Sequence, residues 1–156
     1  MDFDVQVYLL SSKFIEDYSS TEYPELMNKK GRPYSCLLID LHLDYFICIP
    51  FRSHINHRNA YMFKKSQRSK RSRSGLDYSK LVLIKDGKYL DNAVAIVDQD
   101  EYSEAMANMK SIVNDVVKYI DNYVSHEQGK LLMHEREFDR LYKFSTLRYF
   151  HDVLGL

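Results

Sequence analysis

The chain has 156 residues, of which 45% are apolar, and its 22 basic residues balance its 22 acidic residues. This length and composition allow one sizeable hydrophobic core, and no stretch of Gly, Ser or Pro is long enough to be a linker, so we expect a single domain over residues 1–156. No apolar run is long enough to span a membrane, and the N-terminus lacks the features of a signal peptide, which predicts a soluble cytoplasmic protein.

The first residues predict one strand and two short helices. Polar and apolar residues alternate over residues 3–9, which is typical of a half-buried strand. Ser11 is a good helix cap, and acids and apolar residues follow it at helical spacing. Pro24 suits the start of a second short helix over residues 25–30, and Gly31 suits its end.

The next segment predicts a hairpin that leads into a basic loop. Residues 34–41 and 45–51 are apolar and aromatic runs separated by a few polar residues. Pro50 has no amide to donate, so we expect the ladder of the second strand to end there. Residues 60–63 predict a short strand. Residues 64–75 are rich in Lys, Arg and Ser and predict an exposed loop, because so many cations cannot be buried.

Two further strands and a long helix follow. The apolar runs at 81–84 and 93–97 are separated by a turn, which predicts short antiparallel strands. Asp98 and Glu101 have the spacing of a capping box. Apolar residues then recur every three or four positions through residues 102–124, which predicts a long helix with a wide apolar face that packs on the sheet.

The C-terminal residues predict two more short helical segments. Phe138, Leu141 and Tyr142 share one helical face, and Ser145 is a candidate cap for a last helix. These elements together predict an α+β fold: a compact, strongly bent, partly barrel-like antiparallel sheet, with a long helix and several short helices packed around it.

We expect neither a metal site nor a disulfide framework. Cys36 and Cys48 lie in successive apolar runs and are best explained as small buried thiols. The acids around Asp100 coincide with a helix start, where negative charge favours the helix dipole. His126 and His134 lack a third ligand at a recognisable spacing.

The charges of the chain are unevenly distributed. Residues 52–80 hold nine of the 22 Lys and Arg residues and one of the 22 acids, Asp77, which leaves 13 basic and 21 acidic residues elsewhere. A strongly basic segment within an acidic body indicates a polyanionic partner. Ser and His residues are interleaved with these cations, as chemistry directed at phosphate requires. The candidate substrate is RNA.

Several explanations of this segment stay open. A solvated loop explains its composition equally well, but its attachment to predicted strands at both ends suits a loop that closes over a nucleic-acid backbone. Ser53 lacks the elbow of a serine hydrolase. RNA cleavage needs no protein nucleophile, because the ribose 2′-hydroxyl attacks the adjacent phosphate. His54 and His57 are then candidate proton carriers, since arginine stays protonated.

Four motifs together resemble a known family. They are Ser-Ser-Lys-Phe at 11–14, Arg-Pro-Tyr at 32–34, Ile-Pro-Phe-Arg-Ser at 49–53 and Ser-Gly-Leu-Asp-Tyr-Ser-Lys at 74–80. The chain resembles, over nearly its whole length, the toxins of type III toxin–antitoxin systems, and within the ToxN/AbiQ superfamily it is most similar to the CptN branch. The resemblance implies one toxin domain with a bent antiparallel sheet.

The resemblance also implies an activity and a partner. Such toxins are sequence-specific, metal-independent endoribonucleases that leave a 2′,3′-cyclic phosphate and a 5′-hydroxyl, and they need no cofactor. Their partner is an antitoxin RNA, a pseudoknot processed from repeats by the toxin itself, which inhibits the toxin in a closed protein–RNA assembly. Cellular or phage RNA is the substrate, and the implied role is bacterial phage defence by abortive infection, with no membrane and no protein cofactor.

The family's site residues transfer only where the motifs match. The lysine at the start of the family's strand falls on Arg32, and the serine at a strand exit falls on Ser53. The family's best-known branch has Thr-Ser-Pro-Lys at that exit, whereas Arg52, Ser53, His54 and Ile55 stand here, so Arg52 or a cation of the basic segment replaces the missing lysine.

We therefore expect two sets of site residues. The expected catalytic residues are Arg32, Arg52, Ser53, His54 and Lys80. The expected RNA-binding residues are Tyr34, Asn56, His57, Arg58, Lys64, Lys65, Arg68, Lys70, Arg71, Arg73, Ser74 and Ser79. The alternative is a non-catalytic RNA-binding module that uses the same basic surface, and a third hypothesis is a domain that binds acidic proteins.

Overall fold

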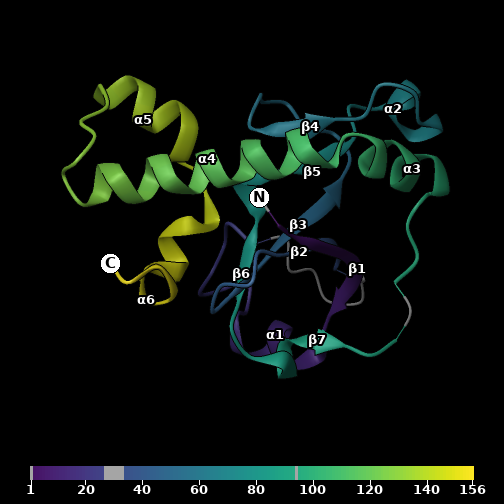
Figure 1. Cartoon of the computed structure of the whole chain (residues 1–156), viewed down its shortest axis with the longest axis horizontal. Helices are drawn as coiled ribbons and strands as arrows, with labels where there is room; N and C mark the ends of the chain where they lie inside the picture. Colours follow the sequence, from purple (N-terminus) through teal and green to yellow (C-terminus); the bar gives the residue numbers. More distant parts are fainter. Residues whose placement is uncertain (1, 27–33, 94) are drawn as a thin grey trace.

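The computed structural model describes residues 2–26, 34–93 and 95–156 (Figure 1). Its strands are β1 (Asp4–Leu10), β2 (Ser35–Asp40), β3 (Phe46–Arg52), β4 (Ala60–Met62), β5 (Gly75–Asp77), β6 (Val82–Ile84) and β7 (Leu90–Asp91). Its α-helices are α1 (Ser12–Asp17), α2 (Gln67–Arg71), α3 (Gln99–Ala107), α4 (Met109–Glu127), α5 (Glu135–Tyr142) and α6 (His151–Leu154). The short 3-10 helices are η1 (Tyr78–Lys80), η2 (Gly87–Tyr89) and η3 (Thr146–Phe150).

The strands form one antiparallel sheet. Its order is β4-β5-β3-β2-β1-β7, and β6 pairs with β3 off this path. The predicted α+β class is confirmed. The barrel-like closure is not, because β4 and β7 end the path without pairing with each other and the sheet stays open. Among the described helices, none has the length and apolar character needed to cross a membrane.

The centre of the sheet is the predicted hairpin. Leu37 of β2 pairs with Val7 of β1 on one side and with Ile49 of β3 on the other. Leu37 and Ile49 are fully buried. Strands that are covered on both faces have continuous apolar sequences, as these two strands have. The N-terminal strand is confirmed, as is the cap on α1, where the Ser11 hydroxyl accepts from the amide of Phe14.

Pro50 does not end β3, although the sequence predicted that it would. The strand continues to Arg52, but its outer partner changes on either side of the proline: β6 pairs with residues 46–48 and β5 with residues 51–52. Between them the chain leaves the ladder as η1. Proline has no amide N–H to donate to a neighbouring strand, so the ladder is interrupted opposite Pro50.

Two predictions for residues 93–124 were wrong in detail. The strand expected over 93–97 is absent from the described part of that range, and the short β7 lies before it. The expected single helix is broken at Asn108 into α3 and α4. The side chain of Asp98 makes no capping hydrogen bond, because the acids that follow it bind another segment of the chain.

The long helix α4 spans the molecule between α3 and α5 (Figure 1). Its buried side chains include Ile112, Val116, Ile120 and Tyr123, which share one helical face, as predicted. α5 packs on the C-terminal half of α4, where the ring of Phe138 stacks on His126 with centroids 4.0 Å apart. The predicted segment around Phe138 and the cap at Ser145 are both confirmed. The helix expected over 25–30 lies largely outside the described residues.

Gly75 has no room for a side chain, because a Cβ atom there would lie 2.2 Å from the backbone oxygen of Tyr61 on β4. Gly75→Ala should therefore push β4 away from β5 and lower the free energy of unfolding by about 1–3 kcal/mol, measured by denaturant unfolding. Gly87→Ala is the matched control, since nothing lies within 4 Å of its Cβ position. Equal stabilities of the two variants would contradict this account.

Candidate functional site

The candidate site is built around Asp77, the last residue of β5. Arg52 ends β3 and pairs with Gly75, so its side chain lies on the same face of the sheet as that of Asp77, two residues along β5. The turn over residues 56–59 leads directly into β4 and brings His57 to the same carboxylate.

The Asp77 carboxylate is fully buried and accepts four hydrogen bonds. Nη1 of Arg52 lies 2.7 Å from Oδ2, and Nε2 of His57 lies 3.2 Å from it. The hydroxyl and the amide of Ser79 lie 2.6 and 3.0 Å from Oδ1. A buried carboxylate is tolerated only when it is paired and hydrogen-bonded, and these donors meet that requirement.

The pKa of Asp77 follows from this balance. Burial by itself would raise the pKa, but the hydrogen bonds from His57, Ser79 and Arg52 outweigh burial and lower it below its ordinary value. The Asp77 carboxyl group is therefore ionised at neutral pH. It acts as the acceptor that fixes the three side chains and not as a proton donor.

The imidazole of His57 is held by hydrogen bonds at both ring nitrogens. Its Nδ1 accepts from the amide of Asn59 at 3.0 Å, so its proton is on Nε2, which faces Asp77. This tautomer is assigned from the two fixed partners. Both ring nitrogens are therefore used, and His57 positions its neighbours and is not a free base.

A cleft of about 430 Å³ opens beside this cluster. One wall is the turn over residues 56–59 together with Ser79, and the other is α5 and the residues that follow it. The Asn59 side chain joins the walls, because its amide donates to the carbonyls of Arg140 and Leu141 at 3.4 and 3.3 Å. The residues that line the cleft are Asn56, His57, Asn59, Ser79, Arg136, Asp139, Arg140, Leu141, Lys143 and Phe144.

The far wall carries three cations that sequence analysis did not select. Arg136, Arg140 and Lys143 are exposed and face one acid, Asp139, in the cleft lining. Phe138 packs inward from the same helix, so the cations must lie on the outer face. The helical spacing of residues 136, 140 and 143 was a visible signal, but only the fold brings that face to His57.

Ser53 and His54 lie just beyond β3. Ser53 is half-buried and His54 is exposed, and within the described part of the chain neither side chain has a hydrogen-bond partner. His54 has φ of 57°, a left-handed conformation that is strained for a residue with a side chain. The sharp bend turns the chain from β3 into the 56–59 turn and leaves the imidazole in solvent.

Lys80, an expected catalytic residue, is paired within the protein. Its Nζ lies 2.9 Å from a Glu25 carboxylate oxygen and 2.9 Å from the carbonyl of Phe144, and its side chain is only 13% exposed. It therefore anchors the wall of the cleft. Tyr34 is buried and donates to the carbonyl of Lys80, so it cannot stack on a base. Arg32 lies outside the described residues.

The segment 64–75 is not the plain exposed loop that its composition suggested. It contains α2, whose first turn is capped by the Ser66 hydroxyl. Three acids of α3 hold it, and two of them bind backbone amides. Asp100 accepts from the amide of Gln67 at 2.8 Å, and Glu104 accepts from the amides of Lys64 and Lys65 at 3.0 and 3.1 Å. Paired backbone groups and a cap give this short segment a defined conformation.

The third acid of α3, Glu101, is buried and binds two expected RNA-binding residues, Ser74 and Arg68. Ser74 and Ser66 donate to it at 2.8 and 2.9 Å, and Nη2 of Arg68 lies 2.6 Å from it. Ser74 is fully buried. Ser79 is likewise buried, and its hydroxyl binds Asp77.

The remaining expected RNA-binding residues form two separate groups. Asn56 and His57 line the cleft, and Arg58 follows them directly in the chain, whereas the exposed cations of the α2 segment lie beside α3. Figure 1 places α2 and α5 near opposite ends of α4, so the two basic surfaces are distinct. The exposed cations of the α2 segment are Lys64, Lys65, Lys70, Arg71 and Arg73.

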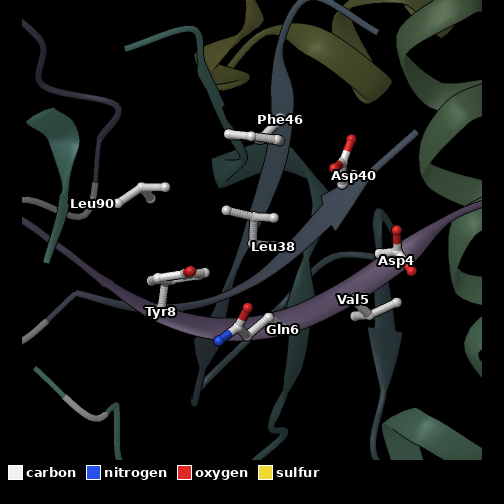
Figure 2. Close-up of a pocket in the computed structure, with 8 residues that line it drawn as sticks. All are labelled: Asp4, Val5, Gln6, Tyr8, Leu38, Asp40, Phe46 and Leu90. Atoms are coloured by element: carbon white, nitrogen blue, oxygen red, sulfur yellow. The ribbon is translucent and has the colours of Figure 1, made fainter. Parts of the chain in front are cut away.

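A different hollow, of about 170 Å³, lies on the β1–β2–β3 surface between Asp4, Tyr8, Leu38 and Phe46 (Figure 2). Asp4 and Asp40 at its edge join exposed His42 in the one group among the described residues with the spacing of metal ligands. The register places this group at the end of β2 away from Arg52, because Asp40 lies beyond the pair Ile39–Ile47 and Arg52 lies beyond Cys36–Pro50. It is an exposed acidic edge separate from the Asp77 site.

Comparisons with protein-family models, with curated proteins and with solved structures gave no match for this chain.

Asp77→Asn should lower the free energy of unfolding by about 2–3 kcal/mol at pH 7, because it leaves the partly exposed Arg52 charge without its partner. The folded-state pKa of Asp77 lies below the ordinary 3.8, so its stabilising contribution is present above that pH and is lost as the pH falls through the folded-state value. The stability difference should therefore shrink in acid. Asp121→Asn, at an exposed acid of α4, is the control, and an equal effect of both would remove Asp77 from its central place.

Proposed function

We propose that the protein is a metal-independent endoribonuclease that cleaves RNA at the cleft beside Asp77. The observation that carries the proposal is the combination of an anchored guanidinium, an unpaired hydroxyl and an unpaired imidazole in three consecutive residues, 52–54. Arg52 binds the same Asp77 carboxylate as His57, and His57 lines the cleft with its cations. Such groups stabilise a phosphate and move protons without a metal ion. The absence of a metal requirement is part of the proposal.

The reaction assigns a simple task to each group. The ribose 2′-oxygen attacks the adjacent phosphorus, and the bond from phosphorus to the 5′-oxygen breaks, which leaves a 2′,3′-cyclic phosphate and a 5′-hydroxyl. Arg52 keeps four of its five N–H groups for the phosphate oxygens after its bond to Asp77. The Ser53 hydroxyl supplies a further hydrogen bond to the developing charge.

The proton is assigned to His54. The 2′-hydroxyl must lose a proton and the leaving 5′-oxygen must gain one. His57 is occupied on both ring nitrogens, whereas His54 is exposed and has no partner among the described residues. His54 is therefore the available carrier, alone or with a phosphate oxygen of the substrate.

The two separate basic surfaces support a second RNA partner. A short substrate needs only the cleft, whereas the cations near α2 lie beyond the far end of α4, a helix about 28 Å long at 1.5 Å per residue. A folded RNA is large enough to contact both surfaces. This arrangement suits the inhibitory antitoxin RNA of a type III system, and we include such a partner, bacterial cytoplasmic location and phage defence in the proposal.

The alternative is a protein that binds RNA without cutting it. The cations of the cleft and of the α2 segment serve that function equally well. The proposal differs from it in assigning chemistry to residues 52–54. The two functions are distinguished by the RNA after incubation, because cleavage creates new RNA ends and binding alone does not.

The test is incubation of the purified protein with a random-sequence RNA in EDTA, followed by analysis of the new ends. We expect discrete products with 2′,3′-cyclic phosphate ends, inert RNA where the cleaved step is 2′-deoxy, and a roughly hundredfold loss of rate in Ser53→Ala. Binding without cleavage would favour the non-cutting protein, and activity that requires added Mg²⁺ would contradict the mechanism.

The cations of the cleft wall give a second prediction. Joint replacement of Arg136, Arg140 and Lys143 by Ser should reduce the slope of log affinity against log salt by about two units, at about 0.7 per lost contact with single-stranded RNA. The control variant carries Lys13→Ser, Lys85→Ser and Lys88→Ser, three exposed lysines outside the cleft lining. Equal slopes for the two triple variants, measured by fluorescence anisotropy, would show that RNA does not lie on α5.

A further inference from the structure

A smaller hollow adjoins the cleft. It measures about 240 Å³ and shares Asn59 and Leu141 with the cleft lining, so the two lie on either side of these residues. Its other walls come from β4, from η1 and from the face of α4 that carries Asp115, Lys118 and Tyr119. This volume is below the range of drug-sized pockets and suits one flat ring system.

Three tyrosines line this hollow, and one of their hydroxyls has no partner at ordinary hydrogen-bond length. Tyr119 donates to the carbonyl of Leu141 at 3.0 Å, and Tyr142 donates to the carbonyl of Tyr119 at 2.8 Å. The Tyr78 hydroxyl is buried, in a residue only 5% exposed, and makes no hydrogen bond of ordinary length to a described residue, although the Asp115 carboxylate lies close enough to act as a weak acceptor. A buried donor with only a weak acceptor is unfavourable, so its presence beside a hollow points to a ligand that pairs with it.

The charged groups at the hollow define that ligand. Burial first, and then the negative charge of Asp115, raise the pKa of Tyr78, so its hydroxyl stays a proton donor. Asp115 is exposed and, when ionised, only accepts. Arg58 and Lys118 place two cations among the lining residues. The ligand must therefore be flat and must present an acceptor beside a donor, with an anionic group attached.

We propose that this hollow binds one nucleobase of the RNA, with the adjoining phosphates at Arg58 and in the cleft. The proposal rests on the RNA-binding part of the proposed function and gives it a source of base selectivity. Base edges carry donors next to acceptors, and bases turned out of a strand are commonly read by hydrogen bonds along these edges. Asn59 lies between the cleft and the hollow, so in this proposal the base turns away from the RNA backbone beside this residue.

The direct test measures binding of AMP, CMP, GMP and UMP, with ribose 5-phosphate as the base-free reference, by titration calorimetry or NMR. At least one nucleotide should bind tenfold or more tightly than ribose 5-phosphate, and the four should differ among themselves. Tyr78→Phe and Asp115→Asn should each weaken the preferred nucleotide about three- to tenfold and leave ribose 5-phosphate unchanged. Asp121→Asn, on the same helix but outside the hollow, should behave as the wild type.

Tyr78→Phe also separates a ligand role from a structural one. The hydroxyl makes no hydrogen bond of ordinary length within the protein, so its removal should leave the unfolding midpoint nearly unchanged or raise it. A lower midpoint, or nucleotides that bind no better than ribose 5-phosphate, would overturn the inference. RNA cleavage without any nucleotide preference would remove only this subsite, whereas selective nucleotide binding without cleavage would remove only the proposed catalysis.

Discussion

The buried carboxylate of Asp77 holds together three segments that the chain itself keeps apart. It takes donors from the end of β3, from the turn before β4 and from η1, and the three side chains that it fixes, Arg52, His57 and Ser79, line or flank the same cleft. A charge in this position is unfavourable unless every donor is present. The geometry of the site is thus coupled to its own ion pair, and the orientation of the His57 ring is a consequence of the same arrangement.

The second wall of the cleft depends on contacts at longer range. Lys80 follows Ser79 directly and binds both Glu25 and the carbonyl of Phe144, so the residue next to the Asp77 cluster also fixes the end of the α5 wall. Asn59 makes the equivalent link from the other side of the cleft to the carbonyls of α5. Residues that resemble catalytic groups in the sequence are here the supports that set the spacing of the two walls.

The sequence predicted most elements but only part of the site. Alternation over residues 3–9, the hairpin and the stripe of α4 are local patterns, and the structure follows them. The sequence could not predict the partners of Lys80, Ser74 and Arg68, because these acids are distant in the chain: Glu25 for the lysine, and Glu101 for the serine and the arginine. The cations of α5 were missed for the converse reason, since a charged helical face is ordinary until the fold brings it to an imidazole. Charge composition located the basic surface, and pairing across the fold decides which charges are free.

The most direct test of the account is amide hydrogen exchange of the Ser53→Ala protein with and without an uncleaved RNA. The account predicts protection by RNA in residues 54–59 and 134–144, the two walls of the cleft, with additional protection in residues 64–73 only when the RNA is large and folded. Protection confined to residues 64–73, or to the β1–β2 surface around Asp4 and Asp40, would place the RNA elsewhere and contradict the assignment of the cleft.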